Sequence, residues 1–243
     1  MKLLCVVILM FLPIFSRADE VLVAVASNFT LPMQKIMAEF QKETGHKVSA
    51  SYGSTGKFYT QIVNGAPFEV LLAADEEHPN KLLSSGLAET HSDFIYAIGK
   101  LVLWSPKENF IDNQEKVLSG KGFRHLSMAS PTLAPYGFAA EQVLKKMGLW
   151  KKLQEKIIYG ENISQAHQFI ASGNAELGFV SLSQVKEAKG SLWIVPRENY
   201  EALKQKAVLL KVGKDKKAAQ QLLKFIRSEK GRHLIQEFGY EVD

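Results

Sequence analysis

The chain has 243 residues, of which 46% are hydrophobic and 23% are charged, so it is long and apolar enough to bury a sizeable core. Its formal net charge is +5, and the basic residues are spread along the chain without forming a stripe interleaved with aromatic residues. This distribution argues against nucleic acid as a partner and is compatible with a small anionic ligand.

Residues 1–18 have the pattern of a secretory signal peptide. Lys2 supplies the positive charge, residues 3–15 are almost wholly apolar, and Ser16-Arg17-Ala18 resembles a cleavage site. The apolar run is too short to span a bilayer, and the only cysteine, Cys5, lies within it. The sequence therefore predicts a mature, secreted chain of 225 residues with a net charge of +3 and no disulfide.

The mature chain begins with a strand pattern that ends in two polar residues. Residues 20–26 form a near-continuous apolar run, which is typical of a strand buried on both faces of a parallel sheet. Ser27 and Asn28 follow, and a helical pattern begins near Thr30, its predicted N-cap, and ends at Gly45. Ligands of open α/β sheets bind outside the carboxyl ends of the strands, so Ser27 and Asn28 are candidate ligand contacts. The alternative interpretation is a simple helix cap.

The second strand and helix are joined by a glycine-rich turn, Gly53-Ser54-Thr55-Gly56. Glycine lets backbone N–H groups approach a small ligand, and the start of a helix adds unpaired N–H donors and positive potential. The turn is not a nucleotide P-loop, because Gly53 lies too close to Gly56 and Phe58 stands where that loop needs a hydroxyl. The sequence predicts either an anion site or only a tight strand-to-helix turn with an N-cap.

The rest of the chain continues to alternate strand and helix patterns, which predicts an α/β fold with parallel pairing. Tyr136 stands at the entry of one helix, as a packing residue or a ligand contact, and Asn162 is expected to cap another. One long extended run, broken at Gly99-Lys100, could cross between two lobes. Further strands are expected over residues 68–74, 96–104, 127–130, 177–182, 193–195 and 207–212, the last being the return crossing.

Six strings of residues stand out along the chain: Val23–Phe29, the Gly-Ser-Thr-Gly turn, Gln61–Phe68, Ala73–Asp75, Tyr96–Ser105 and Ala134–Gly137. They resemble the corresponding strings of the periplasmic molybdate-binding proteins of ABC importers, which belong to the type II periplasmic solute-binding family. The resemblance runs from about residue 20 to the C-terminus. It implies a two-lobed α/β fold of the type II periplasmic-binding-protein class, each lobe a mostly parallel sheet flanked by helices, with the ligand cleft between the lobes. Lobe I would take residues 19–97 plus 207–243, and lobe II residues 98–206.

Carried over position by position, the resemblance implies an oxyanion site with no catalytic residue, no cofactor and no free metal cation. Some relatives place a tyrosine hydroxyl where this chain has Ser181, whose shorter side chain does not extend as far toward a ligand. The implied ligand is molybdate, with tungstate as a second, and the implied partner of a monomeric chain is an ABC permease in the inner membrane. The implied ligand-binding residues are Ser27, Asn28, Ser54, Thr55, Tyr136 and Ile163.

The residue types at these positions suit such a ligand. Molybdate is a tetrahedral dianion that can only accept hydrogen bonds, and Ser, Thr, Asn and backbone N–H groups are donors. Phosphate at neutral pH still carries a proton and favours a site with an acceptor. None of the six positions is Asp or Glu. The pattern therefore favours a fully deprotonated oxyanion.

Three alternatives stay open at this point. A secreted hydrolase would need a nucleophile or a metal site, but the chain has no Gly-x-Ser-x-Gly motif and its six histidines are scattered. The same fold could bind sulfate or another oxyanion. The protein could also act as a sensor that does not deliver its ligand to a transporter.

Overall fold

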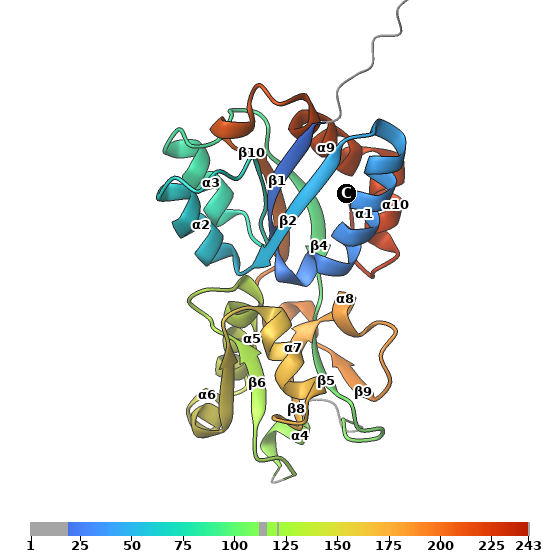
Figure 1. Cartoon of the computed structure of the whole chain (residues 1–243). Coiled ribbons are helices and arrows are strands. Elements are labelled where there is room, and N and C mark those ends of the chain that lie inside the picture. The colour runs from blue at the N-terminus through green and yellow to red at the C-terminus, as the bar shows by residue number, and fades with distance from the viewer. Residues whose placement is uncertain (1–18, 112–115, 121, 243) are drawn as a thin grey trace, which may run out of the picture.

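The computed structural model describes residues 19–111, 116–120 and 122–242, so the predicted signal peptide, residues 1–18, lies outside the described residues. Two five-stranded sheets, each flanked by helices, form two lobes that are stacked one above the other in Figure 1. Within the described ranges, no helix is long and apolar enough to cross a membrane. The predicted two-lobed α/β class is confirmed.

The first lobe is built on a sheet of order β2-β1-β3-β10-β4. The strand β1 is flanked on both sides by parallel partners, β2 and β3, which explains its near-continuous apolar sequence. The strands are β1 (Glu20–Ala26), β2 (Lys47–Gly53), β3 (Val70–Leu72), β4 (Phe94–Gly99) and β10 (Leu203–Leu209). The helices are η1 (Ser27–Phe29), α1 (Thr30–Thr44), α2 (Thr55–Val63), α3 (Glu77–Ser84), η4 (Lys211–Gly213), α9 (Lys217–Arg227) and α10 (Glu229–Gln236).

The second lobe repeats this arrangement with the order β7-β6-β8-β5-β9, in which β6 pairs in parallel with β7 and β8. Its strands are β5 (Leu101–Ser105), β6 (Leu126–Ala129), β7 (Ile157–Gly160), β8 (Leu177–Ser181) and β9 (Ser191–Ile194). Its helices are α4 (Lys116–Ser119), α5 (Pro135–Lys146), α6 (Trp150–Leu153), η2 (Gln154–Lys156), α7 (Ile163–Ala171), α8 (Leu182–Val185) and η3 (Arg197–Asn199).

Both sheets are mixed, where the resemblance implied mostly parallel ones. In the first sheet β10 runs antiparallel to β3 and β4, and in the second β5 runs antiparallel to β8 and β9. The reason is the route of the chain. Each of these two strands enters its sheet from the other lobe, at the edge where the parallel strands end, and must therefore run in the opposite direction.

The chain passes between the lobes close to the predicted positions. Lys100 separates β4 from β5, as the break at Gly99-Lys100 indicated. The return strand was expected over residues 207–212, but β10 begins earlier, at Leu203. The sequence pattern did not reveal this start, because Lys204 and Lys206 interrupt the apolar run. The predicted lobe boundaries, 97/98 and 206/207, fall inside β4 and β10. The division of the chain at those residues stays a prediction.

Each lobe has its own buried core, and the two cores meet between the sheets. Phe29 and Phe40 are fully buried in the first lobe, and Phe179 in the second. Ala26 and Ala74 of the first lobe pack within the core of the second, together with Tyr136 and other side chains. The lobes are therefore in direct contact where the parallel strands of both sheets end.

Candidate anion-binding site

Four helix starts meet at the contact between the lobes. In the first lobe, η1 follows β1 and α2 follows β2; in the second, α5 comes after β6 and α7 after β7. The first N–H groups of a helix have no acceptor within the helix, and the helix dipole places positive potential there. Four such ends on one site favour a bound anion.

All six predicted site residues line one small cavity at this meeting point, with a volume of about 10 Å³. They come from both lobes and are all buried. No carboxylate takes part in the lining, so the cavity offers hydrogen-bond donors to a ligand, as the sequence suggested. The predicted residues are Ser27, Asn28, Ser54, Thr55, Tyr136 and Ile163, and Ala26, Gly53, Ala74, Ala134, Pro135 and Asn162 complete the lining.

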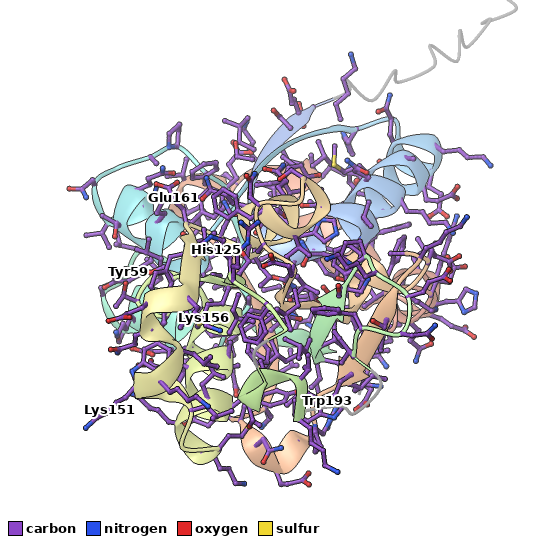
Figure 2. All side chains as sticks on the ribbon, turned by 90° about the horizontal axis from the view of Figure 1, so that it is seen from below. Tyr59, His125, Lys151, Lys156, Glu161 and Trp193 are labelled. Atoms are coloured by element: carbon purple, nitrogen blue, oxygen red, sulfur yellow. The ribbon has the colours of Figure 1, made fainter. Side chains whose placement is uncertain are left out.

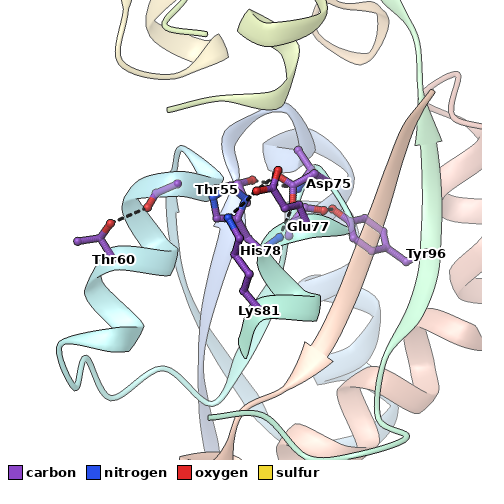
Figure 3. A network of polar contacts seen from close by, with 10 residues as sticks. Thr55, Thr60, Asp75, Glu77, His78, Lys81 and Tyr96 are labelled. Carbon is purple, nitrogen blue, oxygen red and sulfur yellow. Dashed lines mark hydrogen bonds and ion pairs between the residues drawn. The ribbon is translucent and has the colours of Figure 1, made fainter. Parts of the chain in front are cut away.

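The two hydroxyls of the glycine-rich turn differ in their partners. Thr55 Oγ1 accepts a hydrogen bond from the backbone N–H of Ala74 at 3.0 Å, a contact drawn in Figure 3, and so keeps its own hydrogen for a ligand. Ser54 Oγ is buried and has no hydrogen-bond partner among the described residues. A buried hydroxyl without a partner costs about 1–3 kcal/mol. A ligand oxygen in the cavity would remove that cost.

Ser27 also keeps a hydrogen to donate. Its Oγ accepts a long contact, 3.4 Å, from the backbone N–H of Ser164 in the other lobe. Its carbonyl oxygen accepts from Ser164 Oγ at 3.1 Å and from Thr30 Oγ1 at 2.7 Å. The prediction that Thr30 caps the helix was wrong, because Thr30 is the first residue of α1 and its hydroxyl turns back to that carbonyl.

The side chain of Asn28 is directed away from ligand binding. Its Nδ2 donates to Gln205 Oε1 and to the hydroxyl of Tyr240, each at 2.9 Å, so both amide hydrogens are used. The expectation that Asn28 caps the helix was also wrong, since no side chain caps α1. What Asn28 can offer an anion is its backbone N–H at the start of the first helical turn.

The second lobe offers backbone donors. Tyr136 and Ile163 lie in the first turns of α5 and α7, and Asn162 caps α7 by accepting from two backbone N–H groups, as predicted. The phenol of Tyr136 is bonded to Ser181 Oγ at 3.1 Å and Gln205 Nε2 at 3.2 Å. Burial raises the pKa of the Tyr136 hydroxyl well above its usual value, so this hydroxyl stays protonated.

Ser181 lies outside the cavity lining. Its hydroxyl contacts Tyr136 and Ser183 and caps the short helix α8. Some relatives were expected to present a tyrosine hydroxyl to the ligand at this position. In this chain, the Ser181 hydroxyl instead donates a hydrogen bond to the hydroxyl of Tyr136.

Direct contacts hold the lobes together around the cavity. The backbone N–H of Gly56 in α2 donates to the carbonyl of Leu133 at 3.0 Å. Lys57 Nζ contacts Glu161 Oε2 at 2.7 Å, and Glu161, labelled in Figure 2, is largely exposed. Sequence reasoning assigned no role to the contacts that cross between the lobes.

A larger groove of about 460 Å³ lies beside the cavity and shares Ala74, Ala134 and Pro135 with it. Its wall carries charged side chains, including Asp75, whose Oδ2 lies 2.7 Å from Nδ1 of His78 (Figure 3). Carboxylates repel a dianion, so the small cavity is the better oxyanion site. Among the described residues, no group of three or more acidic, histidine or cysteine side chains could hold a metal ion.

Two lobes with a small cavity between them, lined by hydroxyls and helix starts, are the architecture of a solute-binding protein. The chain belongs to the bacterial extracellular solute-binding protein family, whose sequence model matches residues 21–241. This membership confirms the predicted family and the prediction that the protein is not an enzyme.

Two relatives and one solved structure with high sequence identity to the chain are named as molybdate-binding proteins. The chain is 53% identical over 229 residues to the molybdate-binding protein ModA of Azotobacter vinelandii, covering 93% of this chain and 91% of that protein. It is 46% identical over 227 residues to the molybdate-binding protein ModA of Rhodobacter capsulatus, covering 93% and 89%. A solved structure of an Azotobacter vinelandii periplasmic molybdate-binding protein superposes with a TM-score of 0.89 at 44% identity, covering 92% of this chain and 99% of that one.

Proposed function

We propose that the protein captures molybdate, and also tungstate, in the small cavity between its lobes and delivers it to an ABC importer. The observation that carries the proposal is the donor-only lining, in which the buried hydroxyl of Ser54 has no other partner among the described residues. The close relatives, which are named for molybdate binding, support the same ligand.

The six lining residues predicted from the sequence are the proposed ligand contacts. Ser27, Ser54 and Thr55 donate through their hydroxyls, whereas Asn28, Tyr136 and Ile163 donate through backbone N–H groups. Each hydrogen bond to a charged partner contributes about 1.5–3 kcal/mol. Several of them, less the costs of desolvation and lobe closure, support micromolar or tighter binding, roughly −8 kcal/mol or better.

The proposal includes the cellular setting expected from the sequence. The mature protein acts as a monomer in the periplasm after removal of residues 1–18, and a permease of the inner membrane accepts the ligand from it. The two lobes, with the boundaries predicted from the sequence, close around the oxyanion by a hinge motion at the crossing strands.

Parallel calorimetric titrations of the mature protein with molybdate, tungstate, sulfate and phosphate test the proposal. Molybdate and tungstate should bind and raise the melting temperature, because they bind the folded state preferentially. Phosphate should do neither, since its proton finds no carboxylate acceptor in the lining. Equal binding of phosphate would contradict the donor-only site. Sulfate binding without molybdate binding would show that the protein is a solute-binding protein for sulfate.

A further inference from the structure

One buried amide on the crossing strand β10 contacts both halves of the candidate site. Gln205 is 0% exposed, and the register between β10 and β4 shifts at this residue. Its Oε1 accepts from Asn28 Nδ2 at 2.9 Å, and its Nε2 donates to the hydroxyl of Tyr136 at 3.2 Å. Asn28 belongs to the first-lobe turn of the cavity, and Tyr136 belongs to the second-lobe helix start.

The partners of Gln205 are themselves held by buried hydroxyls. The Tyr240 hydroxyl donates to the carbonyl of Asn28 at 2.8 Å, and Ser183 Oγ donates to the same carbonyl at 2.8 Å. The hydroxyl of Tyr96 donates to Gln205 Oε1 at 3.0 Å. Burial raises the pKa of both Tyr96 and Tyr240, so their hydroxyls remain protonated donors.

There is little free space around this amide. A Cβ atom at Gly99, the last residue of β4, would lie 2.1 Å from the hydroxyl oxygen of Tyr136 and 2.7 Å from Gln205 Nε2. Real Cβ atoms do not approach other atoms so closely, so a side chain at this position would force the phenol and the amide to shift. The amide and the phenol are therefore fixed against the strand where the chain leaves the first lobe.

We infer that Gln205 is a positioning residue that couples the two halves of the anion site. Through Asn28 it fixes the first-lobe turn that carries the Ser27 hydroxyl, and through Tyr136 it fixes the helix start that carries the second-lobe N–H. The inference rests on the proposed function, because it assigns Gln205 to the geometry of that same site.

The coupling affects binding because hydrogen bonds are directional. A tetrahedral oxyanion needs donors from both lobes at once, and hydrogen bonds weaken steeply when the donor angle is poor. Gln205 touches neither the cavity nor the ligand position, since it is not among the lining residues. It can therefore change affinity only by changing where the donors of the two lobes stand relative to one another.

The test compares Gln205→Met, Tyr136→Phe and the double variant in molybdate titrations, with Ser105→Ala as a control. Tyr136→Phe keeps the backbone donor and removes only the phenol oxygen that Gln205 contacts. Ser105 is fully buried in the second lobe, and its Oγ donates to Glu176 O at 2.6 Å, so its loss removes a buried hydrogen bond outside the cavity lining. Melting temperatures and small-angle scattering without ligand are recorded for every variant.

We expect Gln205→Met to raise the Kd for molybdate by about tenfold or more, and Tyr136→Phe to raise it by less. The two losses should be less than additive in the double variant, because both changes break the same bridge. Ser105→Ala should lower the melting temperature and leave Kd unchanged. Without ligand, Gln205→Met should have a larger radius of gyration than the wild type.

The opposite results would overturn the inference. A folded Gln205→Met protein that binds as the wild type does, or fully additive losses, would show that the amide only fills space. If Gln205→Met does not fold, a wild-type Kd in Tyr136→Phe would refute the bridge. If the wild-type protein does not bind molybdate, the proposed function is wrong. An unchanged radius of gyration in ligand-free Gln205→Met would then refute the coupling independently of molybdate binding.

Discussion

The two halves of the candidate site use different kinds of donor. Besides the backbone N–H of Asn28, the first lobe presents the side-chain hydroxyls of Ser27, Ser54 and Thr55. The second lobe presents only backbone N–H groups, at Tyr136 and Ile163. One substitution removes a side-chain donor, but a backbone N–H remains when the side chain changes. The affinity for the ligand should therefore depend on side-chain identity in the first-lobe half of the site. In the second-lobe half it should depend on where the helix starts lie.

The largest effect is expected from Thr55→Val in the first half. The substitution removes a ligand donor and also leaves the buried N–H of Ala74 without its acceptor. Molybdate binding should weaken by about 1.5–3 kcal/mol, and the free energy of unfolding should fall by about 1–3 kcal/mol. Calorimetry and thermal melting measure the two losses. A wild-type affinity would exclude the Thr55 hydroxyl as a ligand contact.

Ser54→Ala separates binding from folding. Because Ser54 Oγ has no hydrogen-bond partner among the described residues, its removal breaks no hydrogen bond within the described part of the protein. Affinity should fall by about 1.5–3 kcal/mol, while the unfolding free energy should stay the same or rise. A stability loss as large as that of Thr55→Val would show that the hydroxyl has a partner within the folded protein.

Gly56→Ala tests the contact between the halves. A Cβ atom here would lie 3.0 Å from the carbonyl oxygen of Leu133 in the other lobe. Affinity should fall by about 1 kcal/mol, because the lobes cannot approach fully. Helix α2 should gain stability, since alanine is favoured over glycine within a helix. Titration and melting of the ligand-free protein distinguish the two effects, and a lower melting temperature with unchanged Kd would contradict this expectation.

The smallest effect is expected in the second half. Ile163→Val keeps the backbone N–H in α7 and removes one buried methylene, so unfolding should become easier by about 0.5–1.5 kcal/mol with no change in Kd. Lys57→Gln is a control substitution on the surface of the same interlobe contact. It breaks an exposed ion pair with Glu161, which contributes about 0–1 kcal/mol to the free energy of unfolding. A large affinity loss in Ile163→Val would mean that this half also depends on its side chains.

The sequence alone determined the fold class and which turns line the cavity between the lobes. Apolar runs followed by small polar residues occur at Ser27 and Thr55, and the alternation of strands and helices follows from local periodicity. These features depend on residues a few positions apart. The donor character of the cavity could be predicted for the same reason, since it depends only on which residue types occupy those turns.

Only the tertiary structure decided how the side chains divide their roles. The partners of Asn28 lie 177 and 212 residues away, at Gln205 and Tyr240, and no local pattern connects them. Thr55 meets Ala74 and Ser54 meets no described partner, although the two residues are neighbours in one turn. Periodicity fixes which face a residue lies on, but its hydrogen-bond partners depend on which distant segments pack against that face.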